Sequence, residues 1–389
     1  MIKKRKKIIE PFIHKVILVS HSYELGGAEL SFLETLKALS STGKYKLYAV
    51  FPGRGTLNQL CIPYCKEIFI RYLPWWIDEG TEYPLRKKIE RLKNIIASIK
   101  QAYTLIRDVR PDVIITNTSS IPEFAFAAKI TKTKHVWFIH ELVDHGLNCH
   151  LIYGDTLSKR IISIFSDMVF TNSKFINSHY ARYVPKNRLR MLYQPVDIDP
   201  LSVKKIKANE SKMTLLIMGK VSPFKGQKEA VLACKELFRR GIDFQLLIVG
   251  TEPSSYLEEI VAIIDRNIQE RVKLIPFTEN PQSYYEQADI VLVCSQCEAL
   301  GRVTIEAMKM GLPVVASNQG GNLELIQEGY NGYTYQLGNP TDLANKILQL
   351  ENPIDRRKMG LNGKKWVLNH FNMDTFTQEL DDTLKKLLQ

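Results

Sequence analysis

Short apolar runs separated by helix-length segments recur along almost the whole sequence, and this alternation limits the folds open to the chain. Five such runs fall in the first half, at Lys15–Ser20, Tyr45–Phe51, Pro111–Thr116, His135–Ile139 and Met168–Thr171. Each has the length of a buried strand. Strands that alternate with helices usually pair in parallel, and helices then cover both faces of the sheet. The first half is therefore predicted to be a doubly wound α/β domain.

The same pattern begins again after residue 200. Its strand-like runs are Thr214–Met218, Phe244–Val249, Val272–Ile275, Ile290–Val293 and Pro313–Ala316. The segment between the two sets, Gln194–Asn209, has little apolar periodicity, which is typical of a connection. Since 389 residues exceed what one hydrophobic core usually serves, we predict two Rossmann-like domains facing across a cleft. We place them at residues 1–200 and 201–365, followed by a helix at 366–389 that packs back toward the N-terminal domain.

The net positive charge of the chain lies entirely in its first half. Residues 1–200 carry 30 Lys and Arg against 18 Asp and Glu, whereas residues 201–389 carry 23 of each. The asymmetry indicates an anionic partner, such as phospholipid headgroups, a lipid-linked phosphate or nucleic acid, unless the charge only maintains solubility. The Lys3–Lys7 run and a basic helix predicted at Leu85–Arg110 could rest on anionic lipid, although many such helices merely cover a sheet.

No run approaches the roughly 18 to 20 apolar residues of a transmembrane helix, and no apolar stretch of a secretory signal follows the basic N-terminus. We therefore expect a cytoplasmic protein, peripheral at the inner face of the plasma membrane. The six cysteines are too few and too scattered for a disulfide framework. Cys294 and Cys297 form a C-x-x-C without a second ligand pair, so neither a zinc nor a redox site is predicted.

The segment Cys297–Ala307 is the most informative part of the sequence. Glu298 and Glu306 frame it with seven residues between them, and it follows a predicted strand. A helix is expected to begin near Arg302, which leaves the backbone N–H groups of residues 300–303 free to attract a phosphate. Glu298, in the loop, can reach sugar hydroxyls, and Glu306, one turn into the helix, can accept hydrogen bonds from a ribose diol.

This segment resembles the E-x7-E motif of the family-four retaining glycosyltransferases, the glycosyl transferases group 1. The stretches that follow are similar to that family's continuation, namely Gly311–Val315, Gly320–Glu324 and Asn331–Tyr333. Two glutamates alone would be weak evidence, because glutamates on helix surfaces are mostly solvated, but the ordered series is far more specific. The resemblance implies the two-domain GT-B fold, which agrees with the α/β pattern.

Three further places resemble the family's donor site. The loop 219–226 follows the first strand of the second domain, where the family has an Arg and a Lys that hold the donor diphosphate. Here Lys220 stands at the Arg position, which keeps the charge but loses the bidentate fork, and Lys225 matches the Lys. The loop Gly26–Glu29 resembles the family's first-domain glycine loop, where the backbone approaches the donor phosphate or the acceptor. His140 follows a strand where family members carry a histidine that contacts the transferred sugar.

The resemblance implies sugar transfer with retention of anomeric configuration. The expected catalytic residues are Glu298, His140, Lys225 and Lys220, and the expected donor-binding residues are Gly26, Gly27, Gly219, Leu300, Gly301, Arg302, Val303 and Glu306. The lysines and the helix N-terminus would stabilise the leaving nucleotide diphosphate, which helps to deprotonate an acceptor attacking from the same face. The nucleotide sugar is a substrate and not a cofactor. No metal is predicted, because the D-x-D pair Asp197–Asp199 falls in the expected linker.

Other functions stay open at this point. A nucleotide-sugar epimerase of the same architecture would consume the donor without an acceptor, and a non-catalytic GT-B subunit would keep the fold without turnover. No nucleic-acid partner is expected, because the basic residues lack a recognisable reading motif. We hypothesise a saccharide or lipid-linked acceptor belonging to a growing surface polysaccharide. Trp75 and Trp76 either stack on a sugar or lipid or pack in the core.

Overall fold

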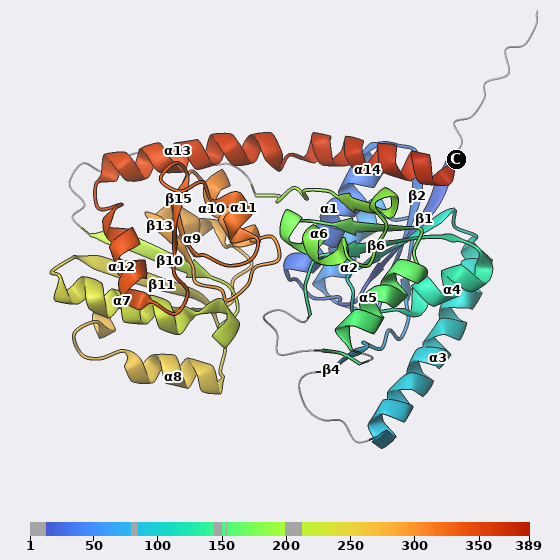
Figure 1. The fold of residues 1–389 in the computed structure, drawn as a ribbon, viewed down its shortest axis with the longest axis horizontal. Coiled ribbons are helices and arrows are strands. Elements are labelled where there is room, and N and C mark those ends of the chain that lie inside the picture. Colours follow the sequence, from blue (N-terminus) through green and yellow to red (C-terminus); the bar gives the residue numbers. More distant parts are fainter. Residues whose placement is uncertain (1–12, 79–84, 144–149, 153, 199–211) are drawn as a thin grey trace, which may run out of the picture.

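Two α/β halves make up the structure, a computed structural model that describes residues 13–78, 85–143, 150–152, 154–198 and 212–389. Each half is built on one parallel sheet, and the two halves lie side by side with the long C-terminal helices running across both (Figure 1). The Lys3–Lys7 run lies outside the described residues, as do Asp199 and most of the expected linker.

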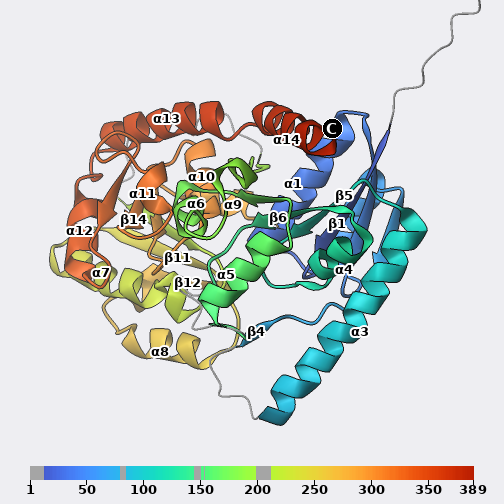
Figure 2. The same ribbon diagram turned by 45° about the vertical axis from the view of Figure 1, so that its right-hand side comes forward.

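The N-terminal sheet has seven parallel strands in the order β3-β2-β1-β5-β6-β8-β9. The strands are β1 (His14–Ser20), β2 (Tyr45–Phe51), β3 (Glu67–Ile70), β5 (Val113–Asn117), β6 (Lys134–Ile139), β8 (Met168–Thr171) and β9 (Leu189–Met191). Its helices are α1 (Gly27–Ser41), α2 (Thr56–Cys61), α3 (Leu85–Val109), α4 (Glu123–Thr131), α5 (Asp155–Ile164) and α6 (Lys174–Tyr180). A short antiparallel pair is formed by β4 (Ile77–Asp78) and β7 (His150–Leu151), and β4 lies between α3 and α5 (Figure 2).

The C-terminal sheet has six parallel strands in the order β12-β11-β10-β13-β14-β15. They are β10 (Met213–Met218), β11 (Phe244–Thr251), β12 (Val272–Pro276), β13 (Ile290–Val293), β14 (Val314–Ser317) and β15 (Gly332–Tyr335). The helices are α7 (Gln227–Arg239), α8 (Ser255–Ile263), α9 (Gln282–Gln287), α10 (Arg302–Lys309), α11 (Asn322–Leu325) and α12 (Pro340–Leu348). The doubly wound α/β class predicted from the sequence is confirmed in both halves.

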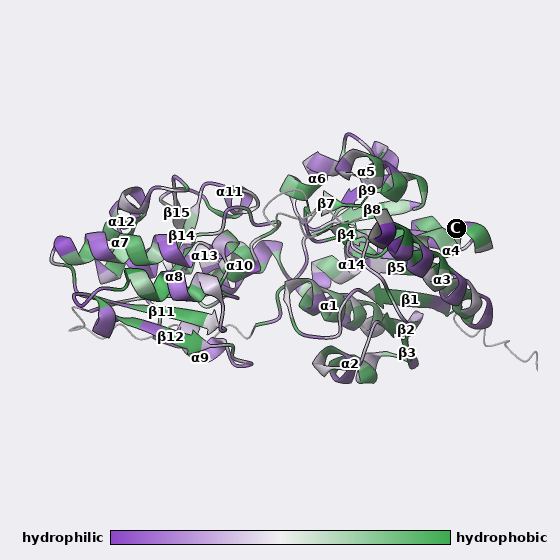
Figure 3. Ribbon diagram, turned by 90° about the horizontal axis from the view of Figure 1, so that it is seen from below, coloured by the Kyte–Doolittle hydropathy of each residue, from purple (hydrophilic) through white to green (hydrophobic). Residues whose placement is uncertain are grey.

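Hydrophobic side chains on both faces of each sheet explain why helices cover both sides. Leu215 and Ile217 of β10 belong to one core cluster, and Leu216 between them belongs to the cluster on the other face. Successive strand side chains point to opposite faces, so a fully apolar run requires cover on each. Figure 3 shows hydrophobic strands inside the layers, with more hydrophilic residues on the outer surfaces of the helices.

The C-terminal segment forms two helices. α13 (Pro353–His370) lies on the C-terminal half, and α14 (Met373–Leu388) packs on α1 of the N-terminal half (Figure 1). Phe376, Leu380 and Leu384 of α14 are buried in the N-terminal core. The boundary expected at residue 366 therefore lies inside α13. The first helix instead ends at His370, and Asn372 caps the second helix. The Asn372 side chain accepts a hydrogen bond from the Thr375 N–H at 2.8 Å.

Helix length and hydropathy leave no candidate for a membrane span in the part of the chain that the structure describes.

His135, on β6, is buried in the N-terminal half and makes folding sensitive to acid. Its Nε2 lies 2.9 Å from Thr116 Oγ1, and burial lowers the pKa of the imidazole from 6.5 to about 3. Between these values the unfolded chain binds a proton that the folded chain does not. His135 should therefore lower the free energy of unfolding by up to about 1.4 kcal/mol for each pH unit between 6.5 and 3.

We expect His135→Gln to weaken the pH dependence of the free energy of unfolding between pH 6.5 and 5, because the variant lacks the one proton that His135 binds on unfolding. Urea denaturation at a series of pH values measures this dependence. Above pH 7 the variant and the wild type should differ only by a constant offset. Identical slopes in the acid range would contradict the assignment.

Candidate active site

The tip of α10 lies at the carboxyl end of the C-terminal sheet, directly after β13 and its loop. Gly301 caps this helix with a φ of +94°, and a Cβ there would lie 3.1 Å from Asn322 Oδ1. A left-handed residue in such close contact favours glycine. The first backbone N–H groups of α10 have no acceptor within the helix, and the helix dipole adds a partial positive charge. This tip can therefore hold an anion.

Glu298 and Lys225 form an ion pair beside that tip. Lys225 Nζ lies 2.6 Å from Glu298 Oε1, and the Ser295 hydroxyl donates to the same oxygen at 2.5 Å. Burial alone raises the pKa of the Glu298 carboxyl, but the Lys225 charge and the two hydrogen bonds outweigh it and hold the pKa below its usual value. Glu298 is thus a charged carboxylate fixed in one orientation, and Lys225 is a cation at the same place.

Lys220 is separate from this pair. Its ammonium pairs with Glu252 Oε1 (2.5 Å), and both side chains are largely exposed. Such surface pairs contribute little energy, so the Lys220 side chain can turn toward another anion. Gly219, directly before it, has a φ of +128°, and a Cβ there would meet no atom within 4 Å. The structure thus places Lys225 in contact with Glu298, whereas Lys220 lies in an exposed pair with Glu252.

Glu306 lies one turn into α10, and its carboxylate is oriented by a tyrosine that sequence reasoning missed. The Tyr285 hydroxyl donates to Glu306 Oε2 at 2.7 Å. Burial raises the pKa of Glu306, although the nearby Arg302 charge and the Tyr285 hydrogen bond oppose the shift. Leu300 is buried and Val303 packs against the same core. The buried Leu300 can therefore offer only its backbone groups to a ligand.

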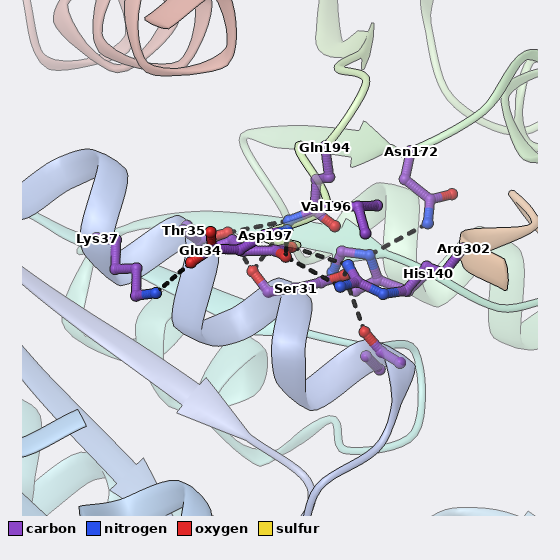
Figure 4. Close-up of polar contacts among 12 residues, drawn as sticks. Ser31, Glu34, Thr35, Lys37, His140, Asn172, Gln194, Val196, Asp197 and Arg302 are labelled. Atoms are coloured by element: carbon purple, nitrogen blue, oxygen red, sulfur yellow. Dashed lines mark hydrogen bonds and ion pairs between the residues drawn. The ribbon is translucent and has the colours of Figure 1, made fainter. Parts of the chain in front are cut away.

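The Arg302 side chain points away from the C-terminal half and contacts α1. Its guanidinium donates to both oxygens of Glu34 at 2.8 and 2.9 Å, and to Ser31 Oγ at 3.2 Å (Figure 4). The exposed fractions of the two side chains are only 15% and 3%. We expected a donor-binding role for Arg302; its backbone stays at the helix tip, but its side chain joins the two halves of the molecule.

The chain segment between the two sheets reinforces this junction. Glu34 Oε1 also accepts the Asp197 N–H at 3.0 Å, and Lys309 Nζ donates to the Val196 carbonyl at 2.6 Å. The Asp197 carboxylate pairs with Lys37 at 2.5 Å (Figure 4). This first aspartate of the D-x-D pair thus takes part in the interface. Among the described residues, no group of three or more His, Cys, Asp or Glu side chains is arranged to hold a metal ion.

His140 lies at the carboxyl end of β6 between two asparagines. Asn117 Nδ2 donates to the Ala28 carbonyl (2.9 Å), which turns Asn117 Oδ1 toward His140 Nε2 at 2.8 Å. Nε2 therefore carries the proton, and Nδ1 faces Asn172 Nδ2 at 3.4 Å. Burial, aided by the charge of Arg302, lowers the pKa of His140 to about 3. The imidazole is neutral at physiological pH and held in one tautomer.

The glycine loop brings the N-terminus of α1 opposite α10. A Cβ at Gly27 would lie 3.3 Å from Arg302 Cδ, and one at Gly26 would lie 2.5 Å from Glu29 Oε2. Larger residues would push against these side chains. The glycine loop, the α10 tip and His140 therefore face the same space between the sheets, where α/β folds bind ligands.

Two sequence families cover nearly the whole of this architecture. Residues 25–200 match Glycosyltransferase Family 4, and residues 199–366 match Glycosyl transferases group 1. The chain belongs to the group 1 glycosyltransferases. The family suggested by the E-x7-E motif and the enzyme class are thereby confirmed.

Individual relatives agree with this assignment. An uncharacterised glycosyltransferase of Methanocaldococcus jannaschii is 27% identical over 82% of this chain and 91% of its own length. The capsular polysaccharide biosynthesis glycosyltransferase CapM of Staphylococcus aureus is 26% identical over 50% of this chain and 51% of its own. Solved structures support the fold: Anabaena HepE in complex with UDP and glucose has a TM-score of 0.75 at 20% identity, covering 96% of this chain and 99% of that one. The glycosyltransferase has the GT-B fold.

Several site residues of this glycosyltransferase were missed by sequence reasoning. They are Glu34, Asn117, Asn172, Tyr285 and Ser295. A signal existed for the two asparagines, because each directly follows or ends a buried strand at the carboxyl edge of a sheet. Nothing in the local sequence distinguishes Glu34 from a solvated helix residue.

Proposed function

We propose that this glycosyltransferase moves a sugar, with retention of anomeric configuration, from a nucleotide-diphosphate sugar to a saccharide or lipid-linked acceptor of a growing surface polysaccharide. The observation that carries the proposal is the Lys225–Glu298 pair beside the open tip of α10. A cation and free amides suit a diphosphate, and a fixed carboxylate suits sugar hydroxyls. The relative in capsular polysaccharide biosynthesis supports the choice of acceptor class.

In the proposed reaction, the bond between the anomeric carbon and the diphosphate oxygen breaks. An acceptor hydroxyl forms the new bond on the same face, and its proton passes to the leaving phosphate oxygen. Lys225, Lys220 and the α10 amides stabilise the negative charge that develops on the diphosphate. Glu298 and the neutral His140 hold the sugar hydroxyls, and Glu306 holds the ribose. No step of this scheme uses a metal ion.

A donor screen tests this proposal. UDP-sugars come first, because the similar Anabaena protein was solved with UDP and glucose. A donor present at a concentration of 100 times its Kd should raise the free energy of unfolding by about 2.7 kcal/mol. If the protein is a transferase, the release of free nucleotide should rise when a saccharide or glycolipid acceptor is added. A new sugar epimer formed without acceptor would instead identify an epimerase, and binding without any turnover would identify a non-catalytic subunit.

Membrane contact through α3 is also part of the proposed function. Ile89, Leu92 and Ile96 are 47%, 44% and 58% exposed, and their spacing places them on one face of this outer helix. Lys93 and Lys100 are exposed along the same side. An apolar stripe beside lysines fits the interface of an anionic bilayer. We propose that the enzyme works at the inner face of the plasma membrane with α3 against the lipid.

The double variant Leu92→Ser/Ile96→Ser is expected to lose most binding to vesicles that contain phosphatidylglycerol, measured by co-sedimentation. The matched control is Ile130→Ser, which removes an isoleucine that is 63% exposed on α4. Wild type and control should bind alike, and added salt should weaken both. Equal binding by the double variant would refute membrane contact through α3.

A further inference from the structure

Two adjacent tryptophans in the N-terminal half have different environments. Trp76 is fully buried, stacks on Trp137 with ring centroids 6.0 Å apart, and donates its indole N–H to the Ser119 carbonyl. Trp75 is 40% exposed, yet its ring is fixed, because its indole N–H donates to the His21 carbonyl at 3.1 Å. The His21 ring lies against it, with centroids 5.2 Å apart. Trp76 is a core residue, whereas Trp75 presents a fixed aromatic face to solvent.

Trp75 lies next to the active site. His21 directly follows β1, at the same sheet edge as His140, and the two imidazoles are close enough that His21 affects the pKa of His140. The Arg302 charge of the opposite half affects the same pKa. His21, His140 and Arg302 thus lie near one another, and Trp75 lies against His21 at this place.

Two carboxylates complete this side. Glu29, in the first turn of α1, is 7% exposed, and its Oε1 lies 3.2 Å from His21 Nε2. Glu141 accepts the N–H and the hydroxyl of Ser119 with Oε1, at 2.7 and 2.8 Å. Burial and the nearby Glu141 raise the pKa of Glu29 to about 7. The two carboxyl groups are therefore close enough to repel each other.

Unsatisfied polar atoms indicate that this cluster is built to meet a ligand. Glu141 Oε2 and His21 Nδ1 are buried without a hydrogen-bond partner among the described residues. Buried polar atoms are normally paired, and leaving one unpaired costs about 1–3 kcal/mol. A ligand with several hydroxyl groups can donate to the carboxylate and the imidazole at once.

We propose that Trp75, His21, Glu29 and Glu141 form the acceptor subsite, and that the group bound there is a neutral pyranose ring and not a phosphate. The flat apolar face of a sugar packs on an exposed indole, and its hydroxyls donate to carboxylates. None of the four side chains offers a cation to a phosphate, because burial lowers the pKa of His21 to about 4. The inference rests on the proposed transferase function and adds the chemical class of the acceptor: a sugar residue receives the new bond.

The experiment uses ligand-observed saturation-transfer NMR on the full chain with UDP present. The probes are octyl and methyl pyranosides of several hexoses, with octyl phosphate as the anionic alternative. At least one hexose should bind, with saturation strongest on its ring protons. A response of both the methyl and the octyl glycoside would indicate a free saccharide, and a response of the octyl form alone would indicate a glycolipid headgroup. Either supports the inference.

The variants compare the aromatic face with its surroundings. Trp75→Ala should weaken pyranoside binding about tenfold, as expected for loss of a stacking contact and its buried area, and Trp75→Phe should recover part of it. Tyr72→Ala removes a neighbouring exposed aromatic as the control and should bind like wild type. UDP binding should be the same in all variants, so a chain that fails to bind UDP refutes the proposed donor site separately. Octyl phosphate bound in preference, no pyranoside bound, or unchanged binding in Trp75→Ala would overturn the inference.

Discussion

Replacing Lys225 by Met is expected to lower the rate of sugar transfer by about 10²- to 10³-fold while the protein stays folded. Lys225 Nζ is held 2.6 Å from Glu298 beside the α10 tip, where the diphosphate charge is proposed to develop. Preorganised cations act most strongly on charge that appears in the transition state, so kcat and kcat/KM should fall together. Steady-state kinetics with the donor found in the screen measure both.

A matched lysine provides the control for this prediction. Lys228, one residue into α7, makes an exposed pair with Glu259 of α8 at 3.1 Å. Lys228→Met should keep wild-type turnover. Glu298→Gln, which preserves shape but removes the charge, should lose activity to a similar extent as Lys225→Met. Wild-type turnover in both Lys225→Met and Glu298→Gln would defeat the site assignment.

Replacing Glu34 by Ala is expected to destabilise the protein by about 3–5 kcal/mol, the largest effect on stability that we predict. Glu34 is the partner of the Arg302 guanidinium in a pair that is almost fully buried between α1 and α10. Without it, a charge stays buried with no counterion, and the Asp197 N–H loses its acceptor as well. Urea denaturation of variant and wild type measures the difference.

The double variant Glu34→Leu/Arg302→Met separates charge burial from packing. Replacing both members of a buried pair by apolar groups is often neutral, so this variant should recover most of the stability lost in Glu34→Ala. The control Glu236→Ala breaks the surface pairs with Arg239 and Arg240 and should lower the free energy of unfolding by less than about 1 kcal/mol. An equal loss of stability in the double variant and in Glu34→Ala would contradict the role of an unpaired charge.

The sequence was sufficient for elements whose signal is local. The apolar run Val16–Val19 of β1 and the periodic pattern of α3 predict those elements within about one residue. The helix expected to begin near Arg302 is α10, which begins at that residue. Gly301 before it has a φ of +94° and is the N-cap. By contrast, β3 and β9 were missed, since these edge strands are short and only partly buried.

Features that depend on contacts between distant segments could not be predicted. Lys220 and Lys225 belong to one loop and look equivalent in the sequence, but only Lys225 folds onto Glu298. Arg302 lies in the E-x7-E motif, yet its guanidinium binds Glu34, which lies 268 positions away in the chain. Such partners are determined by how the two halves pack together, and local residue patterns do not predict this packing.

A crystal structure of the protein with a bound nucleotide sugar tests the central claim most directly. We predict that the diphosphate contacts the backbone N–H groups at the start of α10 and the Lys225 ammonium, with the ribose at Glu306 and the transferred sugar between Glu298 and His140. A nucleotide bound anywhere else, or an α10 tip closed off by protein groups in the complex, would contradict the account.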